Sequence, residues 1–297
     1  MSKVTLDVNR HIKMLIKMLK LVVGWSNRVH FLLASAIALF LMLPYSLLTK
    51  KNFRESFGNL LPRFILSDIE IEFEGVKYIA RGGCSDIVIL MQLCEEGFSH
   101  FKIRREEVVI DVGAHIGLYA LYAAKKGKLC IAIEPCSKNF EHLLRNIQIN
   151  GLDNLIALNY AAWNSDEDRV PLYGPSQKNA DNVLSIDREH LLRELSENGA
   201  KIYEYVETRT IDSILDEIGI NKVDWVKIDV EGAEVEVLQG MKKCLRDNPN
   251  LKILIEVQKE NEAKVNSLLK GFNRVLLIER ARTRDFLYTK NKNISSK

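Results

Sequence analysis

The sequence has 297 residues, of which 47% are hydrophobic and 27% are charged. This is the balance of a globular protein with a substantial core, and it excludes a disordered chain. The formal net charge is +3, but residues 1–63 carry ten Lys and Arg against two acids, which leaves −5 for residues 64–297. An acidic body argues against nucleic-acid binding, and the basic N-terminal part needs its own explanation.

Five cysteines are spread through the chain without any CxxC pair. An odd number of cysteines without close pairs predicts reduced, mostly buried thiols of a cytosolic protein and no zinc site. These residues are Cys84, Cys94, Cys130, Cys136 and Cys244.

The N-terminal part combines a basic amphipathic pattern with an uncharged stretch. In residues 8–23 apolar side chains recur at helical spacing and basic side chains line another face, which suits an anionic membrane surface. The basic residues are Arg10, Lys13, Lys17 and Lys20. Residues 31–49 contain no charge, and their length just reaches what a bilayer core requires. Residues 1–63 are therefore predicted to attach the protein to the cytoplasmic face of a membrane.

The placement of residues 31–49 is left open by the sequence. Pro44 interrupts the stretch, which a membrane-spanning helix tolerates and which also suits a helix-turn-helix lying in the interface. The alternative is a hydrophobic helix that covers the rest of the protein or forms a dimer, and no oligomeric state is indicated. The stretch does not resemble a cleaved signal peptide, because a large basic segment precedes its apolar core.

The following residues have the pattern of an α/β protein. Alternation from Ile69 to Phe73, a turn at Gly75 and an apolar run up to Ala80 predict a β-hairpin, and a helix follows it. From Val108 onward short apolar strands alternate with helical stretches, which is typical of a parallel sheet with helices on both faces. The predicted divisions are 1–63, 64–107, an α/β domain at 108–290 and a basic tail at 291–297.

The motif DVGAHIG follows the first strand of the α/β pattern. Asp111 lies at the end of the strand, and Gly113 and Gly117 bracket the turn into a helix, where backbone can approach an anionic ligand closely. The GxGxxG spacing of dinucleotide-binding dehydrogenases is absent. A helix that needs close packing would also use these glycines, and His115 within the turn is interpreted as a loop residue bonded to backbone.

An acidic residue follows the second strand of the domain. Glu134 comes directly after the apolar run that ends at Ile133. A carboxylate in this position can accept the hydroxyl groups of a ribose, although a solvated strand end is the alternative for such a residue alone. The glycine turn at the expected distance upstream favours ribose binding.

Three carboxylates crowd the end of a further apolar strand, at Asp229, Glu231 and Glu234. Carboxylates at the end of a buried strand repel one another and are costly to desolvate, so we expect them to line a cleft. Glu256, in the next strand, is expected beside them. Glu234 and Glu236 are assigned instead to the first turn of the following helix, where its dipole favours acids.

These motifs together resemble the FkbM-type family of S-adenosylmethionine-dependent methyltransferases, over roughly residues 85–257. The resemblance rests on VVIDVGAHIGLYA, IEP with NFEHLLRNIQIN, VETRTIDSIL and VDWVKIDVEGAEVEVLQG. It implies a class I methyltransferase fold, which is a seven-stranded, mostly parallel, Rossmann-like sheet, with S-adenosylmethionine at the carboxyl ends of its strands. It also implies a hydroxyl group of a sugar, a glycan or a secondary metabolite as the methyl acceptor. The predicted membrane attachment of residues 1–63 favours a lipid-linked saccharide or a lipid headgroup among such acceptors.

The resemblance implies roles for individual residues. Asp111, Gly113, Gly117 and Glu134 would bind the cofactor, and Asp229 would face the reacting methyl group and take the proton of the acceptor hydroxyl. Glu231 is the alternative base or an orienting group, and Glu256 joins the acidic rim. A divalent cation held by Asp229, Glu231 and Glu256 is the disfavoured alternative, so no metal ligand is predicted.

Two other functions compete with this interpretation. An NAD(P)-dependent oxidoreductase would share the glycine turn and the acidic second strand, but the missing GxGxxG and the later carboxylates oppose it. A membrane-attached scaffold with a non-catalytic methyltransferase fold would not need the carboxylates. Methylation of nucleic acid is opposed by the acidic body and by the DVEG sequence after the fourth strand.

Overall fold

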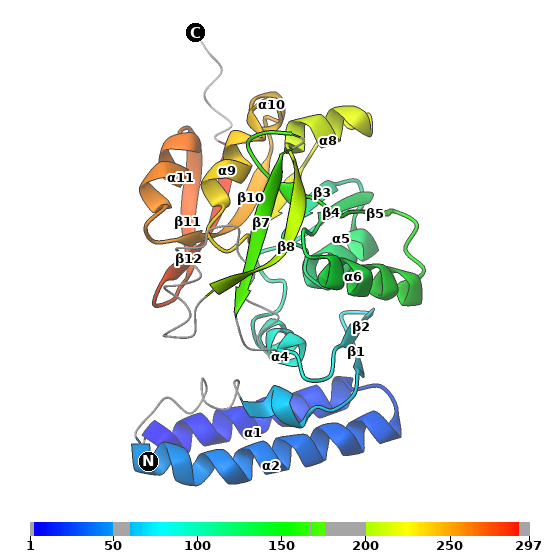
Figure 1. The fold of residues 1–297 in the computed structure, drawn as a ribbon, viewed down its shortest axis with the longest axis vertical. Helices are drawn as coiled ribbons and strands as arrows, with labels where there is room; N and C mark the ends of the chain where they lie inside the picture. The colour runs from blue at the N-terminus through cyan, green and yellow to red at the C-terminus, as the bar shows by residue number, and fades with distance from the viewer. Residues whose placement is uncertain (1–2, 50–59, 167, 176–199, 291–297) are drawn as a thin grey trace. The chain divides into compact units, whose positions relative to one another are not determined.

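The computed structural model describes residues 3–49, 60–166, 168–175 and 200–290 (Figure 1). The chain divides into two compact units, the first with the described residues up to Ser99 and the second with those from His100 on. The predicted basic tail 291–297 and the side chains of Arg10 and Pro44 lie outside the described residues. All five cysteines are free, and all except Cys84 are buried.

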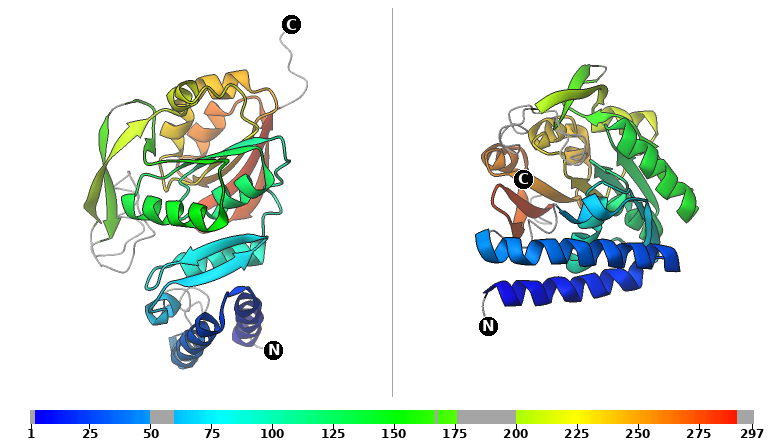
Figure 2. Two further views of the ribbon diagram at one scale, coloured as in Figure 1. Left: turned by 90° about the vertical axis from the view of Figure 1, so that its right-hand side faces the viewer. Right: turned by 60° about the horizontal axis from the view of Figure 1, so that its bottom comes forward.

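The first unit begins with a pair of helices, α1 (Lys3–Leu21) and α2 (Trp25–Thr49). Gly24 between them has a φ of +84°, which glycine adopts without strain and which reverses the chain within a few residues. The two helices run side by side in opposite directions (Figure 2). Because α2 is one continuous helix up to Thr49, the turn that was one alternative at Pro44 does not form.

A short helical turn, η1 (Leu61–Phe64), and a hairpin follow in the same unit. Strands β1 (Ile69–Phe73) and β2 (Val76–Ala80) pair antiparallel through the two-residue turn Glu74–Gly75, both of whose residues have positive φ. Helix α4 (Asp86–Glu96) comes next. The buried carboxylate of Asp86 accepts two hydrogen bonds from the Arg81 guanidinium, at 2.7 and 2.8 Å, which fixes the hairpin to the start of α4.

No helix among the residues whose side chains the structure describes has both the length and the apolar composition needed to cross a membrane.

The second unit is built on a seven-stranded sheet in the order β11-β12-β10-β9-β3-β4-β5. The strands β10, β9, β3, β4 and β5 are parallel, and β12 lies antiparallel between β10 and β11. The bounds are β3 Val108–Val112, β4 Leu129–Ile133, β5 Leu155–Leu158, β9 Trp225–Ile228, β10 Lys252–Gln258, β11 Phe272–Glu279 and β12 Thr283–Lys290. A seven-stranded, mostly parallel sheet confirms the predicted fold class.

Helices cover both faces of this sheet (Figure 2). They are α5 Leu118–Lys126, α6 Ser137–Asn150, α8 Ile211–Glu217, α9 Glu234–Gln239, α10 Lys242–Asp247 and α11 Glu262–Leu268. A large core cluster joins side chains of β3, β9 and β10 to those of α8, α9 and α11. The strands read as continuous apolar runs in the sequence because both of their faces are buried.

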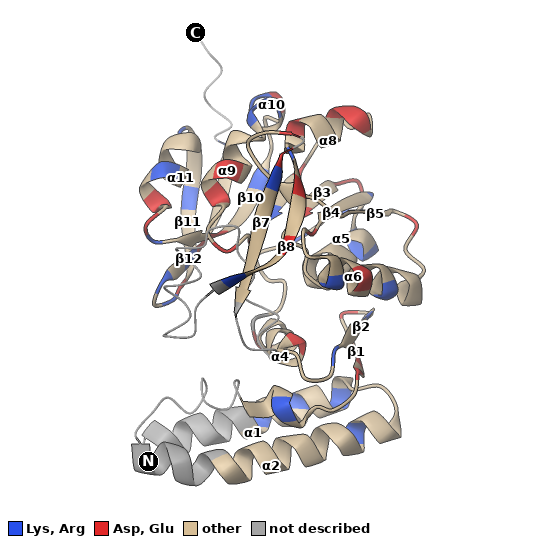
Figure 3. Ribbon diagram, viewed as in Figure 1, with Lys and Arg blue, Asp and Glu red and all other residues tan. Residues whose placement is uncertain are grey.

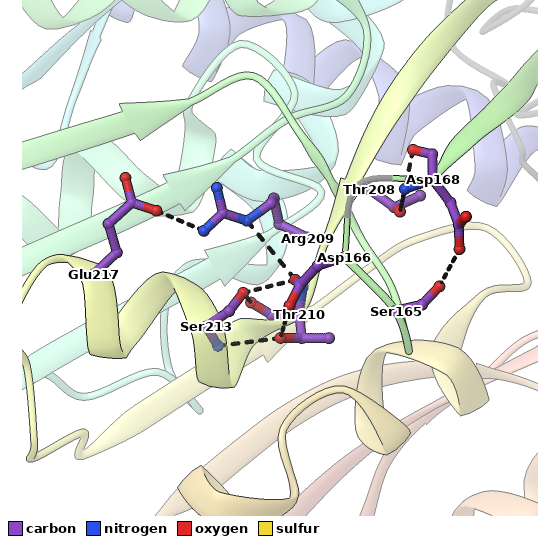
Figure 4. Close-up of polar contacts among 8 residues, drawn as sticks. All are labelled: Ser165, Asp166, Asp168, Thr208, Arg209, Thr210, Ser213 and Glu217. Carbon is purple, nitrogen blue, oxygen red and sulfur yellow. Dashed lines mark hydrogen bonds and ion pairs between the residues drawn. The ribbon is translucent and has the colours of Figure 1, made fainter.

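A smaller sheet of β6 (Ala161–Ala162), β7 (Arg169–Pro175) and β8 (Ala200–Arg209) precedes α8. Figure 4 shows the polar contacts that fix its end to that helix. Asp166 accepts hydrogen bonds from the Thr210 backbone N–H at 2.6 Å and the Ser213 hydroxyl at 2.7 Å, and Thr210 caps α8. These contacts satisfy backbone groups at the start of α8, so they have a structural role.

Candidate active site

The site forms where three neighbouring parallel strands end together. In the register of the sheet Asp111 of β3 lies beside Lys227 of β9, and Val112 lies beside Ile228. Ile255 of β10 is next to Ile228 on the other side. The carboxyl ends of parallel strands are where ligands bind in open α/β sheets.

The turn after β3 is in direct backbone contact with the turn after β9. Gly113 has a φ of +77°, and a Cβ on it would lie only 1.9 Å from the carbonyl oxygen of Asp229. The N–H groups of Gly113 and Ala114 both donate to the carbonyl of Ile133 at the end of β4. Glycine is therefore required at position 113 by the packing of the two turns, independently of any ligand.

Gly117 also has a packing role. It has a φ of +97° and precedes α5, and a Cβ on it would lie 2.7 Å from Cδ1 of Leu143 in α6. The positive φ, which glycine adopts without strain, accounts for glycine at the position, and the flexible end of Leu143 packs against it.

Glu134 is buried and already accepts three hydrogen bonds from the protein. Its Oε1 accepts from the Cys136 backbone at 3.0 Å and from Asn139 Nδ2 at 3.2 Å, and its Oε2 accepts from the His115 backbone at 2.8 Å. Only 5% of the surface of Glu134 is exposed. Burial raises the pKa of Glu134 to about 7, although the hydrogen bonds oppose that rise. The solvated strand end considered for this residue is therefore wrong.

A buried lysine lies between the two aspartates that the sequence had singled out. Lys227 Nζ is 3.5 Å from Asp111 Oδ1 and 3.3 Å from Asp229 Oδ2. Its ammonium also lies 5.0 Å from the centre of the Tyr119 ring. Burial opposes the positive charge of Lys227, but Asp229 and Asp111 outweigh it and raise the pKa above its usual value.

The two aspartates have different surroundings. Asp111 is fully buried, and neither carboxylate oxygen accepts a hydrogen bond of normal geometry from the described residues. Burial raises the pKa of Asp111, and Lys227 counteracts that rise. The side chain of Asp229, by contrast, is 39% exposed. Asp229 is thus open to a substrate, while Asp111 lies behind it in the protein.

A second group of charges completes the rim. Glu256 of β10 is the register partner of Asp285 of β12, and Arg280 Nη1 contacts both carboxylates, at 3.1 Å and 2.5 Å. Burial and the charge of Asp229 raise the pKa of Glu256 to about 8. Burial also raises the pKa of Asp285, which Arg280 opposes. This pair of carboxyl groups therefore retains a proton near neutral pH.

The segment from Asp229 to Glu234 is a tight turn into α9. Glu231 has a φ of +48° and Gly232 a φ of +106°. Glu234 lies in the first turn of α9, as predicted, but it is buried and accepts from the Gly232 N–H at 2.9 Å and from Asn261 Nδ2 at 2.7 Å. Burial raises the pKa of Glu234 to about 7 and that of Glu256 to about 8, and the charge of Glu231 adds to both increases.

The structure thus brings Asp111, Asp229 and Glu256 to one edge of the sheet and adds Lys227, Arg280 and Asp285, which the sequence analysis missed. A lysine inside the apolar run VDWVKI was a visible signal for Lys227. Arg280 and Asp285 had no such signal, because their place depends on the pairing of β12 with β10. Among the residues that the structure describes, no group of three or more His, Cys, Asp or Glu side chains could hold a metal ion.

The raised pKa values predict a pH dependence of stability. Glu256, at about 8, and Glu134 and Glu234, at about 7, bind protons in the folded state that they release in the unfolded state above their ordinary value of 4.5. Their contribution to stability is therefore lost as the pH rises from 4.5 to about 8. Carboxylates with lowered pKa values titrate below this window.

We expect the melting temperature to fall across that window, and Glu256→Gln to reduce the fall in its upper part. A melting temperature that rises steadily with pH, in the wild type and the variant alike, would contradict the burial of these acids.

Comparison with known proteins gives a family for the chain. Residues 111–286, more than half of the sequence, match the methyltransferase FkbM domain. Methyltransferase sdnD of Sordaria araneosa is 27% identical over 203 residues, which cover 61% of this chain and 73% of that protein. Methyltransferase 1 of Beauveria bassiana is 23% identical over 148 residues, which cover 46% of this chain and 59% of that protein.

Two further proteins are similar to the chain. Hexuronic acid methyltransferase AglP of Haloferax volcanii is 26% identical over 166 residues, 56% of this chain and 59% of that protein. The crystal structure of methyltransferase FkbM from Methylobacillus flagellatus has 15% identity and a TM-score of 0.44, over 95% of this chain and 60% of that one. The chain therefore spans about three fifths of several of these relatives. The match to the domain confirms the predicted resemblance, and the chain belongs to the FkbM family of S-adenosylmethionine-dependent methyltransferases.

Proposed function

We propose that this protein transfers a methyl group from S-adenosylmethionine to a hydroxyl group of a sugar, glycan or lipid-linked saccharide. The observation that carries the proposal is the partly exposed carboxylate of Asp229, which lies between the glycine turn of β3 and the carboxyl groups of β10 and β12. A sugar acceptor is supported by the relative whose name is hexuronic acid methyltransferase.

The charges at the strand ends fit a cationic donor. Asp111, Lys227 and Asp229 together carry one net negative charge, and the oxygens of Asp111 accept no hydrogen bond of normal geometry among the described residues. S-adenosylmethionine supplies a transferable methyl group on a positively charged sulfur. Asp111 and the turn from Gly113 to Gly117 would hold this donor at the N-terminal end of α5.

Glu134 would hold the ribose through one remaining acceptor site. A carboxylate offers about four lone pairs, and three of them are used by His115, Cys136 and Asn139. Among the described residues Oε2 accepts from the His115 backbone, so we assign the remaining lone pair to Oε2. This arrangement can therefore bind one ribose hydroxyl rather than two.

Replacing Glu134 with alanine should weaken cofactor binding for this reason. A hydrogen bond to a charged group contributes about 1.5–3 kcal/mol, so we expect affinity for S-adenosylhomocysteine to fall by roughly 10- to 150-fold. Calorimetry of the purified protein measures this, with Glu141→Ala on α6 as a control outside the site. Equal affinity in Glu134→Ala and the wild type would place the ribose elsewhere.

Asp229 is assigned as the base that takes the proton of the acceptor hydroxyl. Its carboxylate is accessible, and the ammonium of Lys227 holds one of its oxygens, which orients the other. Glu256 suits a different role, because a carboxyl group with a pKa of about 8 still carries its proton at neutral pH. It can donate a hydrogen bond to an acceptor oxygen, and Glu231 remains the alternative base.

The competing functions have weaker support. Family membership opposes an NAD(P)-dependent oxidoreductase. A non-catalytic scaffold would have no use for the buried or crowded charges of Asp111, Glu134 and Asp229. The test of the proposal is incubation of the protein with S-adenosylmethionine labelled in its methyl group and extracts of glycans and lipids. Label that appears in saccharides as a methyl ether supports it, and cofactor binding without transfer to any fraction contradicts it.

The acceptor is proposed to lie at the cytoplasmic face of a membrane. The N-terminal residues combine a basic helix with a helix that carries no charge from residue 31 to residue 49. A soluble sugar substrate would not require this combination, but a lipid-linked saccharide would. Fractionation of cells, followed by washes with salt and then carbonate, tests this placement. Recovery of the full-length protein in the soluble fraction without detergent would contradict it.

A further inference from the structure

Helix α2 exposes a continuous apolar stripe. Six large apolar side chains are exposed and, apart from one adjacent pair, follow one another at steps of three or four residues, which places them on one face of the helix. Trp25 is 80% exposed and Phe40 is 78% exposed. The α2 stripe consists of Trp25, Val29, Leu32, Leu33, Ile37 and Phe40.

The opposite face of α2 is packed within its own unit. Phe31, Ala34 and Ala38 follow the same helical spacing and are buried. His30 accepts from the Leu66 N–H through Nε2 at 3.1 Å and contacts the Ser67 hydroxyl through Nδ1 at 3.1 Å. These contacts fix the rotation of the helix, so the stripe does not turn inward. A helix with one face held by protein is not surrounded by lipid.

The charged residues of α1 and α2 from position 12 to position 41 are all positive. Residues 12–41 contain no Asp or Glu, and Lys13 and Lys20 of α1 are exposed, as is Arg28 of α2. Figure 3 shows α2 without charge beyond Arg28 through its described side chains. Ile12 and Ile16 of α1 are also exposed and lie within one helical turn of Lys13. Two copies of this face would bring like charges together, whereas an anionic lipid surface complements them.

We infer that α1 and α2 lie flat in the surface of an anionic bilayer, with the α2 stripe inserted among the acyl chains. Exposed aromatic and aliphatic side chains next to lysines are the composition of helices that bind in the interface. The inference rests on the proposed membrane placement and deepens it, because it names the inserted face and the charge of the lipid.

The test is binding of the full-length protein to vesicles of phosphatidylcholine with and without phosphatidylglycerol. We expect binding to the anionic vesicles, reversed by salt, and a shift of Trp25 emission to shorter wavelength with quenching by brominated lipid. In Lys13→Gln/Lys20→Gln each lost charge should lower the partition coefficient about fivefold. Trp25→Ser/Phe40→Ser should lower it about tenfold or more.

The control is Val275→Ser, which removes a half-exposed apolar residue from β11 of the second unit. We expect its vesicle binding to equal that of the wild type. Unchanged binding in Trp25→Ser/Phe40→Ser would overturn the inference, and so would a dimer in light scattering that this variant converts to a monomer without any vesicle binding. Calorimetry with S-adenosylhomocysteine on the same samples separates failure of the surface from failure of the methyltransferase proposal.

Discussion

Asp229→Asn is expected to retain cofactor binding and to lose about 10²–10⁴-fold in turnover, the usual contribution of a general base. The amide has nearly the shape of the carboxylate but cannot take a proton from the acceptor hydroxyl. Because the side chain is partly exposed, its replacement leaves no buried charge unpaired, and Lys227 keeps Asp111 as its partner. The measurements are methyl transfer to the saccharide fraction and calorimetry with S-adenosylhomocysteine.

Two variants serve as controls for this result. Glu231→Gln and Asp285→Asn remove neighbouring negative charges without removing the assigned base, so we expect them to change turnover far less. A fully active Asp229→Asn protein with an inactive Glu231→Gln protein would move the role to Glu231. Activity abolished by EDTA and restored by Mg²⁺ would contradict the base assignment, because the carboxylates would then be ligands.

The placement of the main carboxylates could be predicted because it depends on local sequence alone. Asp111 and Glu134 each end or follow an apolar run, and a parallel sheet brings such positions to one edge. The fold class followed from the same alternation of strands and helices. The roles of these residues remain predictions, since position at a strand end does not by itself assign chemistry.

The rest depended on contacts between distant segments. Arg280 and Asp285 join the site only because β12 runs antiparallel beside β10 and pairs Glu256 with Asp285. The spacing of residues 279–286 contains no sign of that register. The burial of Glu134 was also hidden, because its donors come from the turns at His115 and Cys136 on either side of β4.

The glycine turn shows why a motif can be recognised while its physical reason is missed. From the sequence we expected Gly113 to let a ligand approach the backbone closely. In the structure, the absence of a Cβ at this position makes room for the carbonyl of Asp229. The turn that holds the cofactor in the proposal and the turn that carries the base are therefore one packed unit. A substitution such as Gly113→Val would test the integrity of this unit rather than cofactor approach.

Lys227→Met should destabilise the protein by about 3–5 kcal/mol, the cost of leaving a buried charge without its partner. Methionine keeps most of the length of the lysine side chain but removes the charge beside the fully buried Asp111. Urea unfolding measures the loss. Lys252→Met of β10 is the matched control, since its partner Glu107 keeps hydrogen bonds from Arg104 and Trp225.

The loss of stability in Lys227→Met should depend on pH. Without Lys227 the pKa of Asp111, already raised by burial, should rise further, so the folded state binds a proton that the unfolded state releases. The variant then loses stability as the pH rises through the pKa of Asp111 in the folded state. The difference in unfolding free energy between the variant and the wild type is therefore smallest at acidic pH. A constant difference at every pH would mean that lost packing, rather than the charge of Asp111, causes the effect.

The double variant Asp111→Asn/Lys227→Met separates stability from chemistry. Removing both charges leaves no buried ion, so we expect most of the lost stability to return. Because Asp111 is assigned to cofactor binding, turnover is compared at saturating S-adenosylmethionine. If Lys227 also orients Asp229, turnover should stay low in this stable protein. Lys227→Arg should restore part of it, because a second cation can contact the same oxygen. A stable double variant with wild-type turnover would limit Lys227 to neutralising Asp111, and Asp229 would then act without a positioning residue.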